Sequence, residues 1–215
     1  MPLKLWLEST TKSILPRIVL EKEKKNGFIT RWRSASAKIC NNIVKTDKIP
    51  TRIVKERNFK VHPPEDGRIK PKEASGIISY TDGSVLDNKT GCGVHTVQGE
   101  RVIYNGNFYL GNTTTVFQAE VTGIRKSAEM LLNKKMEKQT ITFFSDSQAS
   151  LAALNKLTVK SDTVDKCISA LNELGKTNRI HLRWVKAHVG IHGNEVADFL
   201  AKKGSTLGKV LPMNY

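Results

Sequence analysis

Residues 76–84 read Gly-Ile-Ile-Ser-Tyr-Thr-Asp-Gly-Ser, and this stretch gives the strongest indication of the fold. Its first six residues form a β-prone run, and Asp82-Gly83-Ser84 is then a turn signal. The pattern predicts a short strand that ends at Asp82. Strand ends in α/β proteins face the crevice in which ligands bind. Asp82 is therefore the first candidate for a functional residue.

Further elements are predicted in regular order after this strand. Two β-prone runs, at 92–97 and 101–109, predict a hairpin, and apolar residues at helical intervals predict a helix over 115–133. The remaining elements are a strand at 140–144, a helix capped by 145–147 that runs through 154, a helix at 162–175, a strand at 180–185 and a helix at 194–203 closed by Gly204. The order βββ-α-β-α-α-β-α predicts a mixed five-stranded sheet flanked by helices, in the α/β class.

The formal net charge of +15 is divided unevenly along the 215 residues. Residues 1–75 hold 18 Lys and Arg against 8 Asp and Glu, whereas residues 76–215 hold 17 against 12. Such a basic excess indicates an anionic partner, nucleic acid first and acidic lipid second. We interpret residues 1–75 as a basic N-terminal extension or linker, 76–205 as the folded domain and 206–215 as a C-terminal tail.

Several classes of protein are disfavoured by composition. No stretch of eighteen or more apolar residues is present, so we expect no membrane partner. The N-terminal residues lack the apolar core of a signal peptide, and residues 3–20 instead predict a short amphipathic helix broken near Pro16. The three cysteines, Cys40, Cys92 and Cys167, are widely spaced and argue against a disulfide framework or a zinc site. They favour a reducing compartment, and we expect an intracellular location, in the nucleus or the cytoplasm.

Three further acidic residues stand at unusual positions. Asp146 follows the predicted strand at 140–144, whereas Glu120 and Asp198 lie among apolar residues of predicted helices. Carboxylates in such surroundings cost free energy unless they are paired or bind a cation. A cluster of four acids would repel itself unless divalent metal neutralised it, and oxygen ligands suit Mg²⁺ or Mn²⁺. Together with Asp82, these residues predict a divalent metal site.

Each acid taken alone also has a structural interpretation. Asp146 could cap a helix, and Asp82 could belong to a turn. Glu120 could form a salt bridge with a lysine, and Asp198 could face solvent. The functional interpretation rests on the occurrence of all four in this order on these elements.

Four separated motifs resemble those of ribonuclease H domains. They are 80–84 (YTDGS), 117–121 (FQAEV), 144–149 (FSDSQA) and 188–198 (HVGIHGNEVAD). The resemblance is greatest to the ribonuclease H domains of non-LTR retrotransposon polyproteins, and it covers about residues 76–205. The spacings between the four acids, 38, 26 and 52 residues, also suit the family.

The resemblance implies a ribonuclease H fold and an endonuclease that cuts the RNA strand of RNA–DNA hybrids. It assigns Asp82, Glu120, Asp146 and Asp198 as ligands of two Mg²⁺ ions, for which Mn²⁺ could substitute, in a two-metal mechanism that leaves 5′-phosphate ends. His188 matches the family's loop histidine and would transfer a proton or assist product release. In the family this histidine usually follows a glycine, which is absent here.

The resemblance also implies which residues contact nucleic acid. Gly83 and Ser84 could offer backbone groups to the 2′-hydroxyl, which distinguishes RNA from DNA. Thr115 could contact a phosphate or cap its helix. The residues assigned to nucleic-acid binding are Gly83, Ser84, Thr115, Gln118, Gln148 and Asn194.

The partner implied by the family is an RNA–DNA hybrid. Cellular members often carry a basic, tryptophan-containing insertion after the third acid, but residues 155–162 are brief and hold two lysines. Substrate could therefore be gripped by the basic N-terminal segment or by a neighbouring reverse transcriptase domain, and we expect a monomer. Two alternatives stay open: a catalytically idle, nucleic-acid-binding remnant of a mobile element, and another nuclease or transposase that shares the fold.

Overall fold

The computed structural model describes residues 46–64 and 74–207. All of these residues except Thr46 belong to one compact unit that begins at Asp47. The amphipathic helix predicted within 3–20 lies outside the described residues. Among the described helices, none is both long and apolar enough to cross a membrane.

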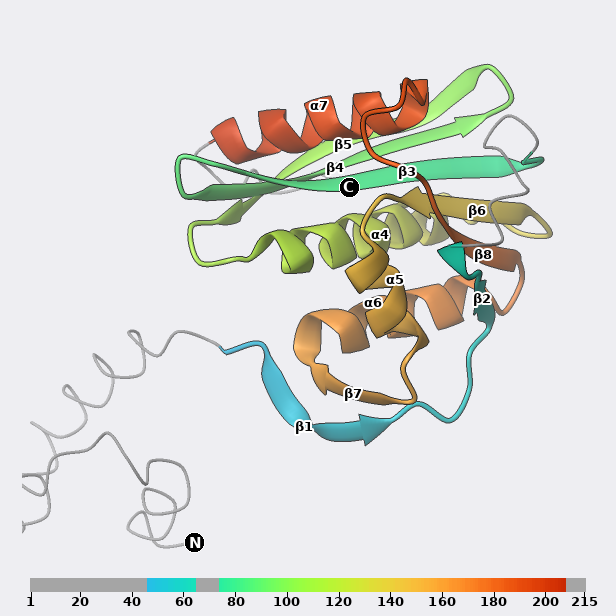
Figure 1. The fold of residues 1–215 in the computed structure, drawn as a ribbon. Coiled ribbons are helices and arrows are strands. Elements are labelled where there is room, and N and C mark those ends of the chain that lie inside the picture. Colours follow the sequence, from blue (N-terminus) through green and yellow to red (C-terminus); the bar gives the residue numbers. More distant parts are fainter. Residues whose placement is uncertain (1–45, 65–73, 208–215) are drawn as a thin grey trace, which may run out of the picture. The chain divides into compact units, whose positions relative to one another are not determined.

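A six-stranded mixed sheet, in the order β2-β8-β6-β3-β4-β5, forms the centre of the fold (Figure 1). The sheet thus matches the predicted α/β class but has one strand, β2, more than the five that the sequence predicted. Strands β3, β4 and β5 form an antiparallel meander, while β2, β8, β6 and β3 run parallel to one another. The strands are β2 (Phe59–Val61), β3 (Ile77–Leu86), β4 (Lys89–Gln98), β5 (Arg101–Gly111), β6 (Thr140–Ser145) and β8 (Arg179–Trp184).

Two strands precede residue 76, at which we expected the domain to begin. Strand β1 (Lys48–Ile53) pairs with β7 (Thr158–Ser161) in a separate two-stranded sheet, and β2 lies at the edge of the main sheet. Val54, which directly follows β1, and Phe59, the first residue of β2, are buried in the core. Neither strand shows a clear alternation of apolar and polar residues, because β2 has only three residues and β1 is exposed at five of its six positions.

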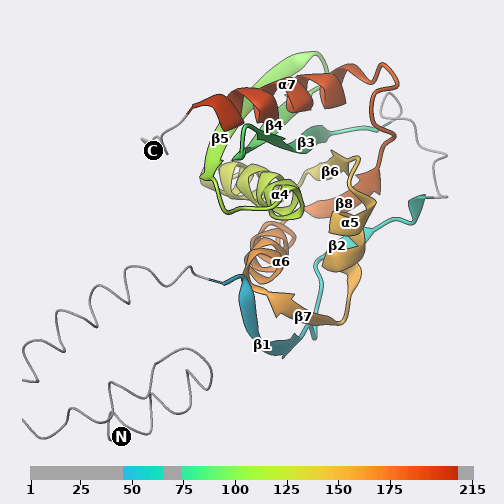
Figure 2. The same cartoon turned by 60° about the vertical axis from the view of Figure 1, so that its left-hand side comes forward.

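Four described helices flank the sheet. Helices α4, α5 and α6 lie on one side and α7 on the other (Figures 1 and 2). The apolar side of α4 faces the core, since Val121, Ile124 and Leu131 are all fully buried. The helices are α4 (Val116–Asn133), α5 (Gln148–Asn155), α6 (Asp162–Leu174) and α7 (His192–Thr206).

The prediction that Asp82 ends its strand and enters a turn was wrong. Strand β3 continues to Leu86, and the turn to β4 falls at Asp87 and Asn88, which both have positive φ angles. Only Ile77–Tyr80 of β3 pair with β6, so Asp82 lies just beyond the point where the two parallel strands separate. Asp82 still lies near the carboxyl end of the parallel strands, although it is within β3 and not at the end of that strand.

One of the predicted helix ends differs in the structure, and the cap of another is narrowed to a single residue. Helix α7 does not stop at Gly204 but continues to Thr206. Gly204 is a point of close packing, because a Cβ there would lie 2.7 Å from the carbonyl oxygen of Phe108 on β5. Helix α5 is capped by Ser147, whose hydroxyl accepts a hydrogen bond from the backbone N–H of Ser150. Asp146 is therefore not the helix cap, which removes one structural interpretation of this acid.

Candidate metal centre

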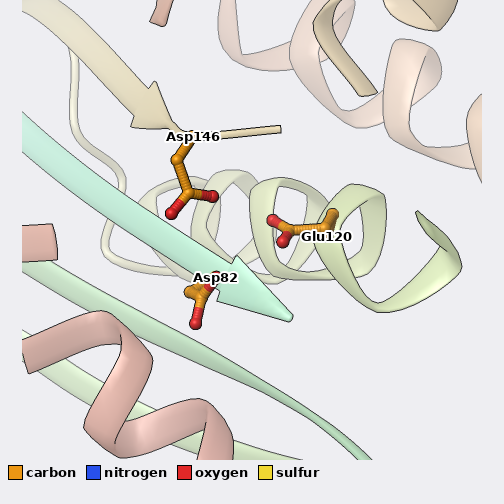
Figure 3. Close-up of side chains that lie close together, drawn as sticks. All are labelled: Asp82, Glu120 and Asp146. Carbon is orange, nitrogen blue, oxygen red and sulfur yellow. The ribbon is translucent and has the colours of Figure 1, made fainter. Parts of the chain in front are cut away.

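Three of the four predicted acids converge in the folded chain. Asp82, Glu120 and Asp146 each place a carboxylate oxygen within 4.8 Å of those of the other two. Figure 3 shows the three side chains pointing toward one another from a strand, a helix and the end of a second strand. They are 38 and 26 positions apart in sequence, so only the fold brings them together.

Each element contributes one feature that makes this convergence possible. Asp82 lies where β3 has separated from β6, and Asp146 directly follows β6. Glu120 reaches them from α4, which can approach β3 because residue 83 is a glycine. A Cβ at Gly83 would lie 2.8 Å from the backbone nitrogen of Glu120 and 2.9 Å from the Cβ of Ala119. Any other residue at position 83 would push the helix, and with it Glu120, away from Asp82.

Burial and mutual repulsion make two of these acids hard to ionise. Burial is the main cause that raises the pKa of Asp82 to about 7, and the charges of Asp146 and Asp198 add to it. Burial likewise raises the pKa of Glu120 to about 9, followed by the charges of Asp82 and Asp146. The Gly83 backbone N–H, which hydrogen-bonds both carboxylates, only partly opposes these effects. The centre therefore gathers acidic side chains whose ionisation the protein itself does not stabilise.

Asp146 is held in place by two donors from other elements. The indole Nε1 of Trp184, at the end of β8, donates to the backbone oxygen of Asp146 at 2.9 Å. The side-chain Nδ2 of Asn194, in the first turn of α7, donates to the Asp146 carboxylate at 3.1 Å. Both the backbone and the side chain of this acid are thus oriented by neighbouring residues.

Asp198, the fourth predicted ligand, is close to the group but not part of it. Its carboxylate accepts a hydrogen bond at 2.6 Å from Lys202, one helical turn further along α7. Its charge nevertheless contributes to the raised pKa of Asp82. The ion pair with Lys202 has a signal in the sequence that we did not use, since oppositely charged residues four apart on a helix commonly pair.

His188 lies on the loop between β8 and α7. Its side chain is exposed, and its backbone adopts a left-handed conformation with a φ of +54°. Among the described residues, none forms a hydrogen bond with the ring. The structure thus leaves His188 outside the group of acids, and its role in proton transfer stays a prediction.

The residues predicted to contact nucleic acid differ in how they are placed. Gly83 and Ser84 are half-buried on β3 directly after Asp82, and Gln148 is exposed at the start of α5. Thr115 and Gln118 are bonded to each other in a capping box, in which Thr115 Oγ1 accepts from the Gln118 backbone N–H and Gln118 Oε1 accepts from the Thr115 N–H. Capping is therefore the role that the structure shows for this pair.

One residue that orients the centre was not found from the sequence. Trp184 belongs to the alternating pattern of β8, which predicts a strand but not the direction of an indole N–H. No signal in a single sequence would have linked Trp184 to Asp146, 38 positions earlier.

The three converging acids fit a divalent cation. They offer only oxygen ligands, which Mg²⁺ and Mn²⁺ prefer. Two of them have strongly raised pKa values, so a cation would remove an unfavourable interaction that the folded protein otherwise contains. Carboxylates so arranged can hold metal ions beside a phosphate group and support its hydrolysis.

Comparison with known families agrees with this geometry. The family model described as RNase H matches residues 74–206, which is more than half of the chain. The chain belongs to the RNase H family. The match includes all four acids as well as Trp184, His188 and Asn194. It begins after β1 and β2, so these two strands lie outside the part of the chain that the family model describes.

Relatives in the RNase H family include two bacterial proteins. Ribonuclease HI of Haemophilus influenzae is 29% identical over 155 residues, which cover 65% of this chain and 96% of that protein. A ribonuclease H of Actinobacillus succinogenes is 31% identical over 140 residues, which cover 60% of this chain and 89% of that protein.

Solved structures show the same fold at lower identity. The N-terminal RNase H domain of a Mycobacterium tuberculosis protein has a TM-score of 0.50 at 19% identity, covering 60% of this chain and 98% of that chain. The protease–reverse transcriptase of prototype foamy virus has a TM-score of 0.52 at 19% identity, covering 69% of this chain and 23% of that one. At this level of identity the two likenesses establish the RNase H fold alone.

Proposed function

We propose that this RNase H chain is a metal-dependent endonuclease that hydrolyses the RNA strand of RNA–DNA hybrids. The observation that carries the proposal is the convergence of Asp82, Glu120 and Asp146 within 4.8 Å. Family membership supports it, since the two bacterial relatives are named ribonucleases H. Metal use is supported by three acids that meet at one point, two of them with raised pKa values, because a bound cation would favour their ionised forms, and Mg²⁺ is the ion we propose.

The chain's own residues would perform distinct tasks. Asp82, Glu120 and Asp146 would hold two divalent ions, with Asp198 as the fourth ligand, because its charge already acts on Asp82. When bound, the ions would supply activation of a water molecule and stabilisation of the departing 3′ oxygen. His188, on its exposed loop, would accept or deliver a proton at its imidazole.

The wider setting is a separate proposal. We infer that the chain derives from a retrotransposon polyprotein and acts inside the cell, in the nucleus or the cytoplasm. The support is the likeness of its four motifs to those of non-LTR retrotransposon domains. A neighbouring reverse transcriptase domain would then be a partner, and the full chain would bind hybrid more tightly when that domain is added.

Cleavage of an end-labelled RNA–DNA hybrid tests the catalytic proposal. Wild type should cut the RNA strand internally with Mg²⁺ and leave 5′-phosphate ends, and EDTA should stop it. Asp146→Asn should lower the rate by at least about 100-fold, the scale on which loss of electrostatic transition-state stabilisation is measured. Asp162→Asn is the matched control, because Asp162 pairs with Lys166 on the exposed side of α6.

Two outcomes would contradict the proposal. Hybrid that stays whole while wild type binds it would favour the catalytically idle remnant. Equal cleavage by wild type and Asp146→Asn would show that the three converging acids are not the catalytic centre.

A further inference from the structure

Asp146 lies between two elements, outside both β6 and α5. It directly follows β6, where the backbone leaves the sheet, and it precedes Ser147, the cap of α5. The indole of Trp184 holds its backbone oxygen, and Asn194 holds its carboxylate. The orientation of the carboxylate thus depends on a side chain from α7, which lies on the opposite side of the sheet from α5 (Figure 1).

Asn194 is itself a costly residue for the fold. Its side chain is nearly inaccessible, with 3% of the residue exposed, and its Oδ1 is buried with no hydrogen-bond partner among the described residues. The amide orientation follows from chemistry, since only the NH₂ group can donate to the Asp146 carboxylate. An unpaired buried carbonyl oxygen opposes folding, so stability alone gives no reason for an asparagine here.

Close packing fixes where Asn194 lies. The preceding residue, Gly193, touches the ring of Tyr80 so closely that a Cβ would lie 2.2 Å from its Cε2 atom. Tyr80 is buried on β3, two residues before Asp82. The first turn of α7 is therefore held directly against the strand that carries the first acid.

We propose that Asn194 is a positioning residue of the metal centre. Its NH₂ group fixes the Asp146 carboxylate in the orientation in which it meets Asp82 and Glu120. This inference rests on the proposed metal-dependent function, and it replaces the predicted role of Asn194 as a nucleic-acid contact. A residue with 3% of its surface exposed has little access to a nucleic acid, whereas it contacts an acid of the centre directly.

Asn194→Leu is the decisive variant, because leucine has nearly the same shape but neither the donor nor the unpaired acceptor. Without metal, its melting temperature should equal or exceed that of wild type, since the buried Oδ1 is removed. Its Mg²⁺ affinity, measured by calorimetric titration, should fall about tenfold or more, as is typical when a residue that orients a metal ligand is removed. Hybrid affinity in EDTA should not change, and cleavage should recover as the Mg²⁺ concentration is raised.

Asn172→Leu provides the matched control on α6. The Asn172 side chain accepts a hydrogen bond from the Asn58 backbone N–H and donates one to the backbone oxygen of Glu56, remote in sequence from the acids. This variant should melt at a lower temperature than wild type and bind Mg²⁺ with wild-type affinity. The two substitutions should thus have opposite patterns of effect on stability and on metal binding.

Three results would overturn the inference, and they are distinguishable. Equal Mg²⁺ affinities of wild type and Asn194→Leu would show that Asn194 does not position the centre. A loss of hybrid affinity in EDTA would restore its role as a nucleic-acid contact. Absence of Mg²⁺ binding by wild type would overturn the proposed function itself. If the leucine variant does not fold, Asn194→Ala tests the same loss of Mg²⁺ affinity.

Discussion

At the scale of single residues, the acids of the candidate metal centre lower the stability of the folded protein when no metal is bound. Asp82 and Glu120 have pKa values of about 7 and about 9 in the folded chain, against ordinary values of 3.8 and 4.5. At pH values between the ordinary and the raised pKa, each side chain keeps its proton in the folded chain but has lost it in the unfolded chain. The folded state of the metal-free protein is therefore penalised more as the pH rises.

This penalty predicts a pH dependence of stability in EDTA. As the pH rises from about 4.5 to about 9, the unfolded state loses its Glu120 proton first, so the free energy of unfolding should fall by on the order of a few kcal/mol. Urea denaturation at pH 5 and pH 9 measures it. Glu120→Gln should remove most of the fall, whereas Glu173→Gln, an exposed residue paired with Lys176, should not. Wild-type stability that rises over this interval would contradict the prediction.

At the scale of elements, the segment with β1 and β2 is hydrogen-bonded to both ends of α6. Asp47 accepts hydrogen bonds from Ser161 and Thr163 at the start of this helix. Burial alone would raise the pKa of Asp47, but these hydrogen bonds lower it overall. At the other end of α6, Asn58 donates hydrogen bonds from its backbone N–H and its side-chain Nδ2 to the side-chain and backbone oxygens of Asn172.

Two truncations test whether this segment is part of the folding unit. Removal of residues 1–45 should leave the melting temperature unchanged, because the compact unit begins at Asp47. Removal of residues 1–62 also deletes the buried Val54 and Phe59. Loss of a buried Phe alone costs about 3–5 kcal/mol, which corresponds to a fall of roughly 6–20 °C for a domain of this size. Differential scanning calorimetry measures both melting temperatures. Equal values for the two truncated proteins would contradict the assignment of this segment to the folding unit.

The elements also show why sequence patterns succeed in one part of the chain and not in another. The long helix α4 and the hairpin strands were predicted because 18 or 10 residues are enough to display a period. Strand β2 has three residues and shows none, so it was missed. The glycine at 204 signals a helix end in sequence but serves close packing against β5 in the structure.

At the scale of the whole molecule, a large share of the net basic charge precedes the compact unit. Residues 1–45 contain ten Lys and Arg against three Asp and Glu, nearly half of the net charge of +15. Cations that contact phosphates release counterions from nucleic acid, which makes binding sensitive to salt. We therefore expect the N-terminal residues to strengthen binding to a hybrid without taking part in its cleavage.

Deletion of residues 1–45 tests this division, and it leaves β1 and β2 in place. Affinity for a hybrid, measured by fluorescence anisotropy at salt concentrations from about 50 to about 200 mM, should fall. The dependence of log affinity on log salt should become less steep, by about 0.9 for each phosphate that the shortened chain no longer neutralises. The cleavage rate at saturating hybrid should equal that of the full chain. Unchanged affinity and salt dependence would show that the basic residues of 1–45 do not bind the substrate.

Residue patterns along the chain were enough to predict the class of fold, the four acids and the family to which the motifs belong. These properties follow from local periodicity and from residue types at particular spacings, and both can be read from the sequence without knowledge of how the elements pack. Packing in three dimensions was needed to show that Asp82, Glu120 and Asp146 converge while Asp198 pairs with Lys202. It was needed also to show that Asn194 donates a hydrogen bond to the Asp146 carboxylate. Such contacts join positions up to 64 apart in sequence, and their geometry depends on how strands and helices pack.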